Sequence, residues 1–305
     1  MRKRLRLAGI FGCAATIVMA GCSSGSSVST LPGPATPIQT QRVQARKIIH
    51  YMGTRAMAEP LVSGVLFTYG GGPVLVKPKM YIIFWGYKTY GDPDKVKPLL
   101  KEYAKRIGGS GQTNIYTQYY ETSGGKNVDV RNPASQFGGA WEDDTDPVPT
   151  NPSDAQVETE ALAGVKHFGY DPNGSYIVAT PHGRNSPGFG SSFCAYHSDA
   201  VSSGETISYT NLPYMPDAGG NCGANYISPP ADEKGVDEGV TVVEGHEYGE
   251  SITDATPSNG WTNQRYGEIG DACAWYDVTN DPFGDKSYAS QPMYSNASES
   301  CVHSY

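Results

Sequence analysis

Residues 246–250 read His246-Glu247-Tyr248-Gly249-Glu250 and offer three chemically active side chains within five positions. We expect them to lie on a helix over residues 236–253. Residues four apart lie on the same face of a helix, so His246 and Glu250 could bind one metal ion together. Glu247 lies about a hundred degrees around the helix, close enough to contact a water on that metal. The pattern therefore predicts a metal site with an adjacent carboxylate base.

This pattern resembles the His-Glu-x-x-His helix of zinc peptidases, in which two ligands come from one turn and the glutamate between them is the general base. Here Glu250 replaces the second histidine, and a carboxylate is an accepted zinc ligand. The alternative is a solvated helix face. The rest of the helix is apolar, which indicates burial, and acidic groups buried together are costly unless a cation or protons neutralise them.

A second acidic pair, Glu268 and Asp271, follows the helix after a turn. It resembles the pair in thermolysin-like peptidases, where a glutamate about twenty residues on is the third ligand and the next acidic residue orients the first histidine. Glu268 would then complete the ligand set. Asp271 could instead be the third ligand, with Glu268 behind it, and the sequence does not separate these arrangements. Either arrangement predicts one zinc ion per chain.

His197 is the further candidate for catalysis, since it could line the same cleft and stabilise a tetrahedral oxyanion. The alternative is a strand histidine bonded locally near a disulfide. Catalysis itself has an alternative, because several carboxylates around zinc make the ion a weaker Lewis acid than imidazoles do. The metal would then serve structure alone.

The N-terminus predicts export. Four basic residues precede an apolar run over residues 7–20, which is too short to span a bilayer, since spanning needs roughly twenty residues. The run ends in Ala20-Gly21-Cys22, which resembles the bacterial lipobox. We therefore predict a signal peptide over residues 1–21 and a lipid on Cys22 that anchors the chain in the cell envelope, in the outer membrane if the cell has one. The alternative is an ordinary signal peptide with an incidental Cys22.

Composition bounds the rest of the chain. Residues 22–60 are rich in small and polar residues, which predicts a flexible tether before a single domain over residues 61–305. The chain has 23 Lys and Arg against 31 Asp and Glu, a net charge of −8. This acidic balance argues against a nucleic-acid partner, because phosphate binding needs a basic face.

The cysteines after Cys22 predict two disulfides, because four cysteines in an exported chain usually pair. Three pairings exist, and we favour the one that closes two short loops. No Cys-x-x-Cys spacing supports zinc binding by these residues. The favoured pairs are Cys194 with Cys222 and Cys273 with Cys301.

The hydrophobic pattern predicts an α/β (α+β) fold with a mixed sheet and a zincin-like metal-site helix. The stretch over residues 122–152 should be loop with one strand, and only turns should follow residue 253. Strands are expected over residues 80–85, 114–120, 127–130, 175–179, 193–196 and 206–210. Helices are expected over residues 93–107, 153–168 and 236–253, the first of them kinked or starting late because of Pro98.

Several strings along the chain resemble bacterial relatives of the plant EXORDIUM (phosphate-induced protein 1) family, over most of residues 65–275. They are the runs over residues 70–86, 108–110, 119–120, 193–197, 212–214, 246–254, 260–261 and 267–273. The resemblance implies an exported single domain, and it implies no particular reaction because the plant members have no settled activity.

These features together favour a lipid-anchored, zinc-dependent hydrolase that acts on peptides outside the cytoplasm. A second interpretation is a non-enzymatic surface protein that binds cell wall or glycan and uses the metal for structure. A third is a carbohydrate-binding module that presents tryptophans and tyrosines to a sugar.

Overall fold

The structure is a computed structural model that describes residues 47, 49–58 and 62–305. The predicted signal peptide over residues 1–21, the predicted lipid site Cys22 and most of the predicted tether lie outside the described residues. Among the described residues, no helix combines the length and the apolar character needed to cross a membrane.

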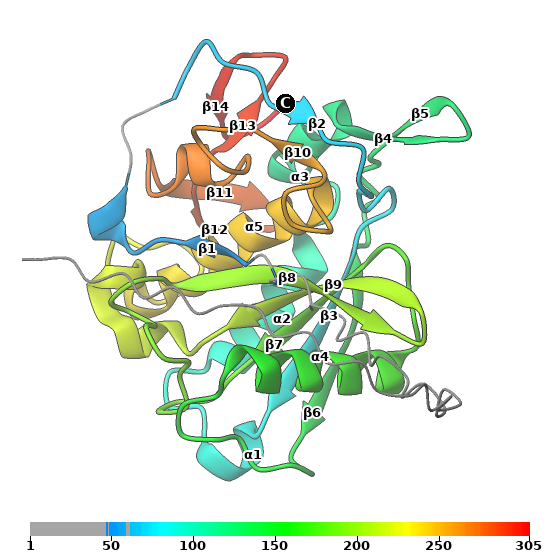
Figure 1. The fold of residues 1–305 in the computed structure, drawn as a ribbon. Helices are drawn as coiled ribbons and strands as arrows, with labels where there is room; N and C mark the ends of the chain where they lie inside the picture. The colour runs from blue at the N-terminus through cyan, green and yellow to red at the C-terminus, as the bar shows by residue number, and fades with distance from the viewer. Residues whose placement is uncertain (1–46, 48, 59–61) are drawn as a thin grey trace, which may run out of the picture. The chain divides into compact units, whose positions relative to one another are not determined.

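A mixed sheet forms the centre of the fold and confirms the predicted α/β class (Figure 1). In the described part of the chain it has six strands in the order β1-β8-β9-β7-β3-β6. Strands β9, β7, β3 and β6 are parallel neighbours, β8 runs antiparallel to β9, and β1 antiparallel to β8. The strands are β1 (His50–Met52), β3 (Lys79–Trp85), β6 (Phe137–Asp143), β7 (Gly174–Ala179), β8 (Ala195–Ser202) and β9 (Glu205–Leu212).

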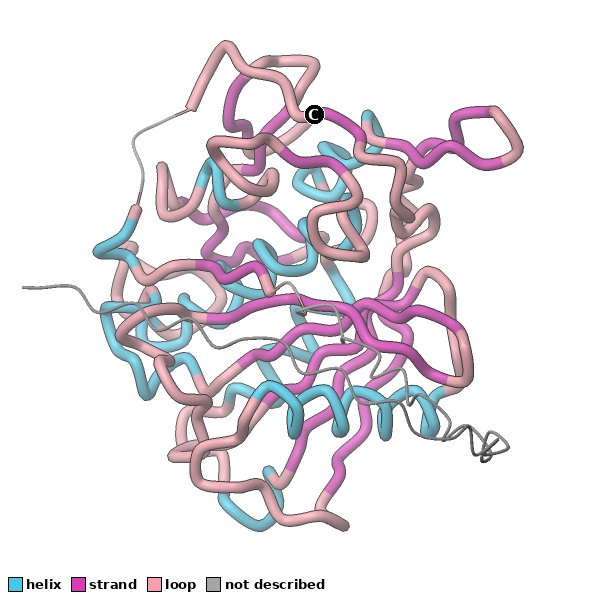
Figure 2. Tube along the Cα trace, in the orientation of Figure 1, coloured by secondary structure: helices cyan, strands magenta, loops and turns pink. Residues whose placement is uncertain are grey.

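Helices cover both faces of this sheet because its side chains alternate between two hydrophobic clusters. Ile83 and Trp85 pack with α4 (Asp154–Phe168) on one face. Ile82 and Phe84 share the other cluster with α2 (Val96–Arg106) and α5 (Glu238–Thr253). Figures 1 and 2 show α4 and α5 on opposite sides of the strands.

The predicted helices exist, with small changes at their starts. Helix α2 begins at Val96, so Pro98 lies in its first turn, where the missing N–H costs no helical hydrogen bond. Helix α4 follows Ser153, whose backbone N–H donates to the Gln156 side chain at 2.9 Å. The other helical segments are α1 (Tyr87–Tyr90), η1 (Arg55–Met57), η3 (Met215–Cys222), η4 (Gly235–Asp237) and η5 (Asp271–Cys273).

One predicted strand fails, and one strand of the main sheet was not predicted. Residues 114–118 of the predicted strand 114–120 lie in α3 (Gly111–Ile115) and η2 (Tyr116–Gln118) instead, with Ser110 capping α3 through its hydroxyl. Strand β6 lies in a stretch expected to be mostly loop and joins the main sheet. Its Gly138 leaves room for the Tyr81 ring, which a Cβ there would meet at 2.5 Å. The expected strand over residues 127–130 is β5 (Lys126–Asp129), paired with β4 (Tyr120–Ser123).

The segment after α5 contains more structure than the expected turns. Strand β10 (Trp261–Thr262) pairs with β2 (Thr68–Tyr69). Two antiparallel pairs follow, β11 (Thr279–Phe283) with β12 (Lys286–Ser290) and β13 (Met293–Ser295) with β14 (Ser300–Val302). Both favoured disulfides are present, Cys194–Cys222 and Cys273–Cys301.

The folded unit begins earlier in the chain than the predicted boundary at residue 61. Strand β1 pairs with β8 over three residues, and the Cys194 N–H donates to the Met52 carbonyl at 2.9 Å. Met52 is fully buried. Residues 49–58 are therefore part of the domain, and the prediction of a tether extending to residue 60 is corrected there. The composition of this segment gave no sign of its place in the domain, because a single buried apolar residue, Met52, is enough to hold it against the sheet.

Candidate metal centre

Helix α5 lies at the centre of the domain, and every one of its residues is buried. It contacts β8 and β9 on one side and β12 on the other. Gly249 permits this close packing, because a Cβ at that position would lie 2.5 Å from the Tyr116 hydroxyl and from the Met293 methyl. The acidic side chains of α5 are thus held in the interior, which excludes the solvated-face alternative.

His246, Glu250 and Asp271 form the first candidate group. The His246 Nε2 lies 3.1 Å from Glu250 Oε1 and 3.7 Å from Asp271 Oδ1. The Asp271 N–H donates to Glu250 Oε1 at 2.9 Å, which fixes the loop against the helix. These three side chains could hold one ion. Of the two arrangements that the sequence left open, the one with Asp271 beside His246 and Glu250 matches this geometry.

Glu268 points to a different pair of side chains. Its Oε1 lies 3.4 Å from His197 Nε2, and its Oε2 lies 3.1 Å from the Nδ1 of His50 on β1. Glu268 also belongs to a second candidate group, with His50 and Asp271. The acidic pair does not start a helix at Glu268, since the short η5 begins only at Asp271.

His197 lies within the same cluster, as expected if it lines the cleft. It sits on β8 with its ring toward α5, and its Nδ1 is 3.4 Å from Glu247 Oε2 and 3.6 Å from Glu250 Oε2. Its Nε2 is 3.3 Å from the carbonyl oxygen of Asp254, directly after α5. His197, Glu247 and Glu250 form a third group that could hold an ion, so Glu250 is shared between two groups.

The cluster buries more carboxylates than bases. Burial and the neighbouring Glu268 and Glu247 raise the pKa of Glu250 well above its usual value. Burial, then Glu250, does the same to the pKa of Asp271. Burial is the largest single influence on His197 and opposes its charged form, yet Glu268, Glu247 and Glu250 together outweigh burial and raise the pKa of His197 well above its usual value. The hydrogen bond to Glu268 raises the pKa of His50 to about 9.

Glu268 itself is held ionised. Burial favours its neutral form, but the charges and hydrogen bonds of His197 and His50 lower its pKa below the usual range. Asp254 responds in the opposite direction, because burial and the Glu268 charge raise its pKa to about 7. The raised pKa values mean that some of these carboxyl groups hold protons, which reduces the excess negative charge of the cluster. A divalent cation would neutralise that charge equally well.

Two residues of the centre escaped the sequence analysis. His50 comes from β1, in a stretch whose composition suggested a tether. Gln291 follows β12, and its side-chain nitrogen lies 3.0 Å from the Gly270 carbonyl oxygen and 3.1 Å from His246 Nδ1. The Trp275 N–H donates to the Gln291 oxygen at 3.3 Å. Gln291 therefore occupies the position behind His246 that one of the two arrangements left open by the sequence gave to Asp271.

The donor atoms suit a zinc ion. His246 Nε2 and Glu247 Oε1 are buried without a hydrogen-bond partner among the described residues, and both Glu268 carboxylate oxygens lie close to histidine nitrogens. Imidazole nitrogen and carboxylate oxygen are accepted zinc ligands. One condition attaches to His246: binding through Nε2 requires the ring proton on Nδ1, where the Gln291 amide now donates.

The centre reaches solvent through Asp271, whose side chain is a quarter exposed. Asp271 lines a pocket of 560 Å³ between the segment after β1 and the loop before η5. Gly53, Thr54 and Met57 form one wall, and Tyr266 and Trp275 belong to the other. A small ligand could therefore approach the cluster from this side.

Comparisons of this chain with protein-family models, with curated proteins and with solved structures found no match. The candidate centre is therefore argued from its own geometry.

Proposed function

We propose that this chain is a zinc-dependent hydrolase that cleaves peptide bonds. The observation that carries the proposal is the buried cluster around α5, in which three candidate ligands, a free carboxylate and a histidine converge with an excess of negative charge. The α5 motif and the acidic pair after it resemble the zincin pattern, and their burial favours a metal over a solvated helix face.

Each residue then has a definite role. His246, Glu250 and Asp271 would hold the ion, which supplies Lewis acidity toward a substrate carbonyl. Glu247 Oε1, which has no hydrogen-bond partner in the described part of the chain, accepts the proton of the attacking water. His197, 3.4 Å from Glu247, donates to the oxyanion that develops on the carbonyl. Glu268 keeps His197 protonated and oriented.

A non-enzymatic role with a structural metal is the second candidate. Its support is the near-complete burial of Glu247, Glu250 and His197, none of which exposes more than 1% of its side chain. A closed site of this kind suits a structural ion better than a catalytic one, which keeps an open position. In this alternative the protein would be a cell-surface module that binds glycan or wall material.

The envelope location is part of the proposal. The N-terminal signal and Cys22 favour a lipoprotein with a membrane as its partner, and the two disulfides suit an oxidising compartment. The resemblance to the EXORDIUM family supports an exported domain in the same way.

Metal content is the first test. The full-length protein, purified without a metal-affinity tag, should contain about one zinc per chain by elemental mass spectrometry. Glu250→Ala should lose the metal, because it removes the carboxylate shared by two candidate groups. Glu299→Ala, at an exposed glutamate, is the matched control and should keep it. A folded, metal-free wild-type protein would refute the proposal.

Turnover separates the two functions. Glu247→Gln should abolish hydrolysis of a peptide library while the zinc remains bound, because the amide cannot accept the proton. Wild-type protein that binds zinc but cleaves no peptide would favour the structural alternative. Activity retained by Glu247→Gln would exclude Glu247 as the base.

A further inference from the structure

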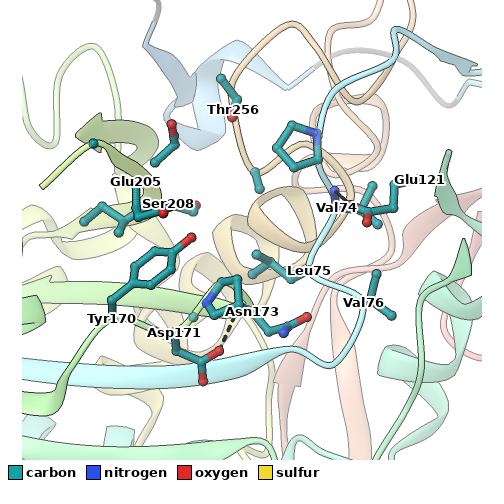
Figure 3. Close-up of a pocket in the computed structure, with 17 residues that line it drawn as sticks. Val74, Leu75, Val76, Glu121, Tyr170, Asp171, Asn173, Glu205, Ser208 and Thr256 are labelled. Atoms are coloured by element: carbon teal, nitrogen blue, oxygen red, sulfur yellow. Dashed lines mark hydrogen bonds between the residues drawn. The ribbon is translucent and has the colours of Figure 1, made fainter. Parts of the chain in front are cut away.

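A second pocket lies where β7 and β9 begin, on the side of the sheet that carries α5 (Figure 3). Its volume is 500 Å³. Val74, Leu75 and Ala255 give it apolar walls, and the loops before β7 and β9 supply its polar side chains. These polar side chains include Glu121, Tyr170, Asp171, Glu205 and Ser208.

The described residues that line the pocket include three carboxylates and no basic side chain. Glu121 accepts the Val74 N–H at 3.1 Å, and Asp171 accepts the Tyr81 hydroxyl at 2.9 Å. Glu205 lies beside Tyr170 and hydrogen-bonds to its hydroxyl. Among the described residues that line the pocket there is no Lys, Arg or His. The three carboxylates therefore face the cavity with no positive charge to balance them.

Ser208 is the observation that points to a ligand. Its side chain is only 2% exposed and lines the pocket, yet its hydroxyl has no hydrogen-bond partner among the residues that the structure describes. A buried polar group without a partner is costly, so a hydroxyl in this position fits a ligand that completes its bonding. Tyr170 is 43% exposed and presents its ring at the same pocket.

We propose that this pocket binds a cationic group, a primary ammonium or a guanidinium, such as the side chain of a lysine or arginine. The carboxylates balance its charge and, with the Ser208 oxygen, accept its N–H groups. The Tyr170 ring offers a face to the cation, and the apolar walls suit the methylene chain that precedes the charge. A neutral sugar would leave the carboxylates uncompensated.

The pocket adjoins the candidate metal centre. Ala255 and Thr256 in its wall directly follow Asp254, whose carbonyl oxygen is 3.3 Å from His197 Nε2. Ser208 lies two residues before Thr210, the strand partner of His197. A peptide with a basic side chain in the pocket would thus place its backbone toward His197. This placement of the peptide backbone rests on the proposed hydrolase function. Binding of the cationic group in the pocket does not depend on that function.

Calorimetric titration of the full-length protein at low ionic strength tests the pocket. The probe is N-acetyl-lysine methylamide, and its neutral counterpart is N-acetyl-norleucine methylamide. We expect the lysine derivative to bind and the norleucine derivative to bind at least about fivefold more weakly. Glu205→Gln should weaken lysine binding about threefold to fivefold, because it removes one exposed carboxylate. Glu299→Gln, outside the pocket, should leave binding unchanged.

Several outcomes decide the matter. Equal affinity for the two probes, no binding of the lysine derivative, or unchanged binding in both Glu205→Gln and Ser208→Ala would overturn the proposal. Agmatine is a probe without a peptide backbone. If it binds as tightly as the lysine derivative, the pocket binds a cation and its ligand is a free amine. If it binds more weakly, the pocket binds a cation and its ligand is a peptide. Glu250→Ala should bind the lysine derivative normally, so loss of the metal centre and loss of this pocket are separable.

Discussion

The protonation of His246 depends on a side chain that the motif does not contain. The Gln291 nitrogen donates to the Gly270 carbonyl, and the Trp275 N–H requires the Gln291 oxygen as acceptor. This orientation directs an N–H of the amide at His246 Nδ1. A neutral His246 therefore carries its proton on Nε2, the nitrogen that lies 3.1 Å from Glu250 Oε1. Zinc binding at Nε2 would displace that proton and require the opposite tautomer.

This coupling can be observed directly. In metal-free protein, the side-chain nitrogen NMR signals of His246 should report a proton on Nε2. One equivalent of zinc should move the proton to Nδ1, because the ion takes the Nε2 lone pair. Gln291→Leu removes the donor to Nδ1 and should raise zinc affinity, about tenfold by analogy with other residues behind metal ligands. An unchanged tautomer on zinc addition would show that His246 is not a ligand through Nε2.

At the same scale, the sequence pointed to six residues of the candidate centre but not to their partners His50 and Gln291. Helical geometry fixes His246, Glu247 and Glu250 relative to one another, so a short string suffices to place them. His50 and Gln291 join through β1 pairing and through the segment after β12, which are long-range contacts. Their own sequence neighbourhoods contain no metal-ligand spacing, and sequence reasoning therefore had no signal for either.

Between elements, α4 and β6 bring two carboxyl groups together in the interior. Glu160 of α4 is 4% exposed, and within the described ranges its Oε1 has no hydrogen-bond partner. Asp143, at the end of β6, accepts hydrogen bonds from the Thr145 N–H and hydroxyl. Burial and then the Asp143 charge raise the pKa of Glu160 to about 8. The folded protein therefore holds a proton on Glu160 that the unfolded chain releases at lower pH.

The sign of the pH dependence follows. Glu160 contributes stability below its unfolded pKa of 4.5, and that contribution is lost as the pH rises toward the folded pKa of about 8. Glu160→Gln removes the titration, so the variant should gain at least about 2 kcal/mol over wild type between pH 5 and pH 8. Urea unfolding at both values measures this. Glu158→Gln, two residues away and partly exposed, should show no such trend; a constant Glu160→Gln difference would contradict the argument.

How far elements could be predicted depended on how they are stabilised. Strands β3 and β7 are buried on both faces and read as continuous apolar runs, so composition identified them. Strand β6 was missed because its glycines accommodate the neighbouring rings of Tyr81 and Phe168 and leave little apolar pattern. Residues 114–120 alternate weakly, but the Ser110 cap and the packing of Tyr116 and Tyr119 in the core make most of the segment helical.

Over the whole molecule, chain segments far apart in sequence close the domain around α5. The disulfides tie the start of β8 to η3 and join η5 to β14. Strand β1 covers the edge of β8, and its His50 reaches Glu268 from there. The residues after β1 are also held against the domain, since the Trp275 indole donates to the Gly53 carbonyl at 2.8 Å. Cysteine count predicted the disulfides, whereas no composition signal predicted the N-terminal strand.

A truncation series tests whether residues 49–58 belong to the domain. A fragment of residues 46–305 keeps β1, whereas a fragment of residues 61–305 loses the buried Met52 and leaves the β8 edge unpaired. We expect the shorter fragment to melt about 5–10 °C lower, since loss of a buried methionine side chain alone costs roughly 2–5 kcal/mol. It should also associate, because an uncovered strand edge invites pairing. Met52→Ala in the longer fragment should reproduce most of the melting loss and none of the association. Equal melting temperatures for the two fragments would show that residues 49–58 belong to the tether and not to the domain. His50 would then not be part of the candidate metal centre.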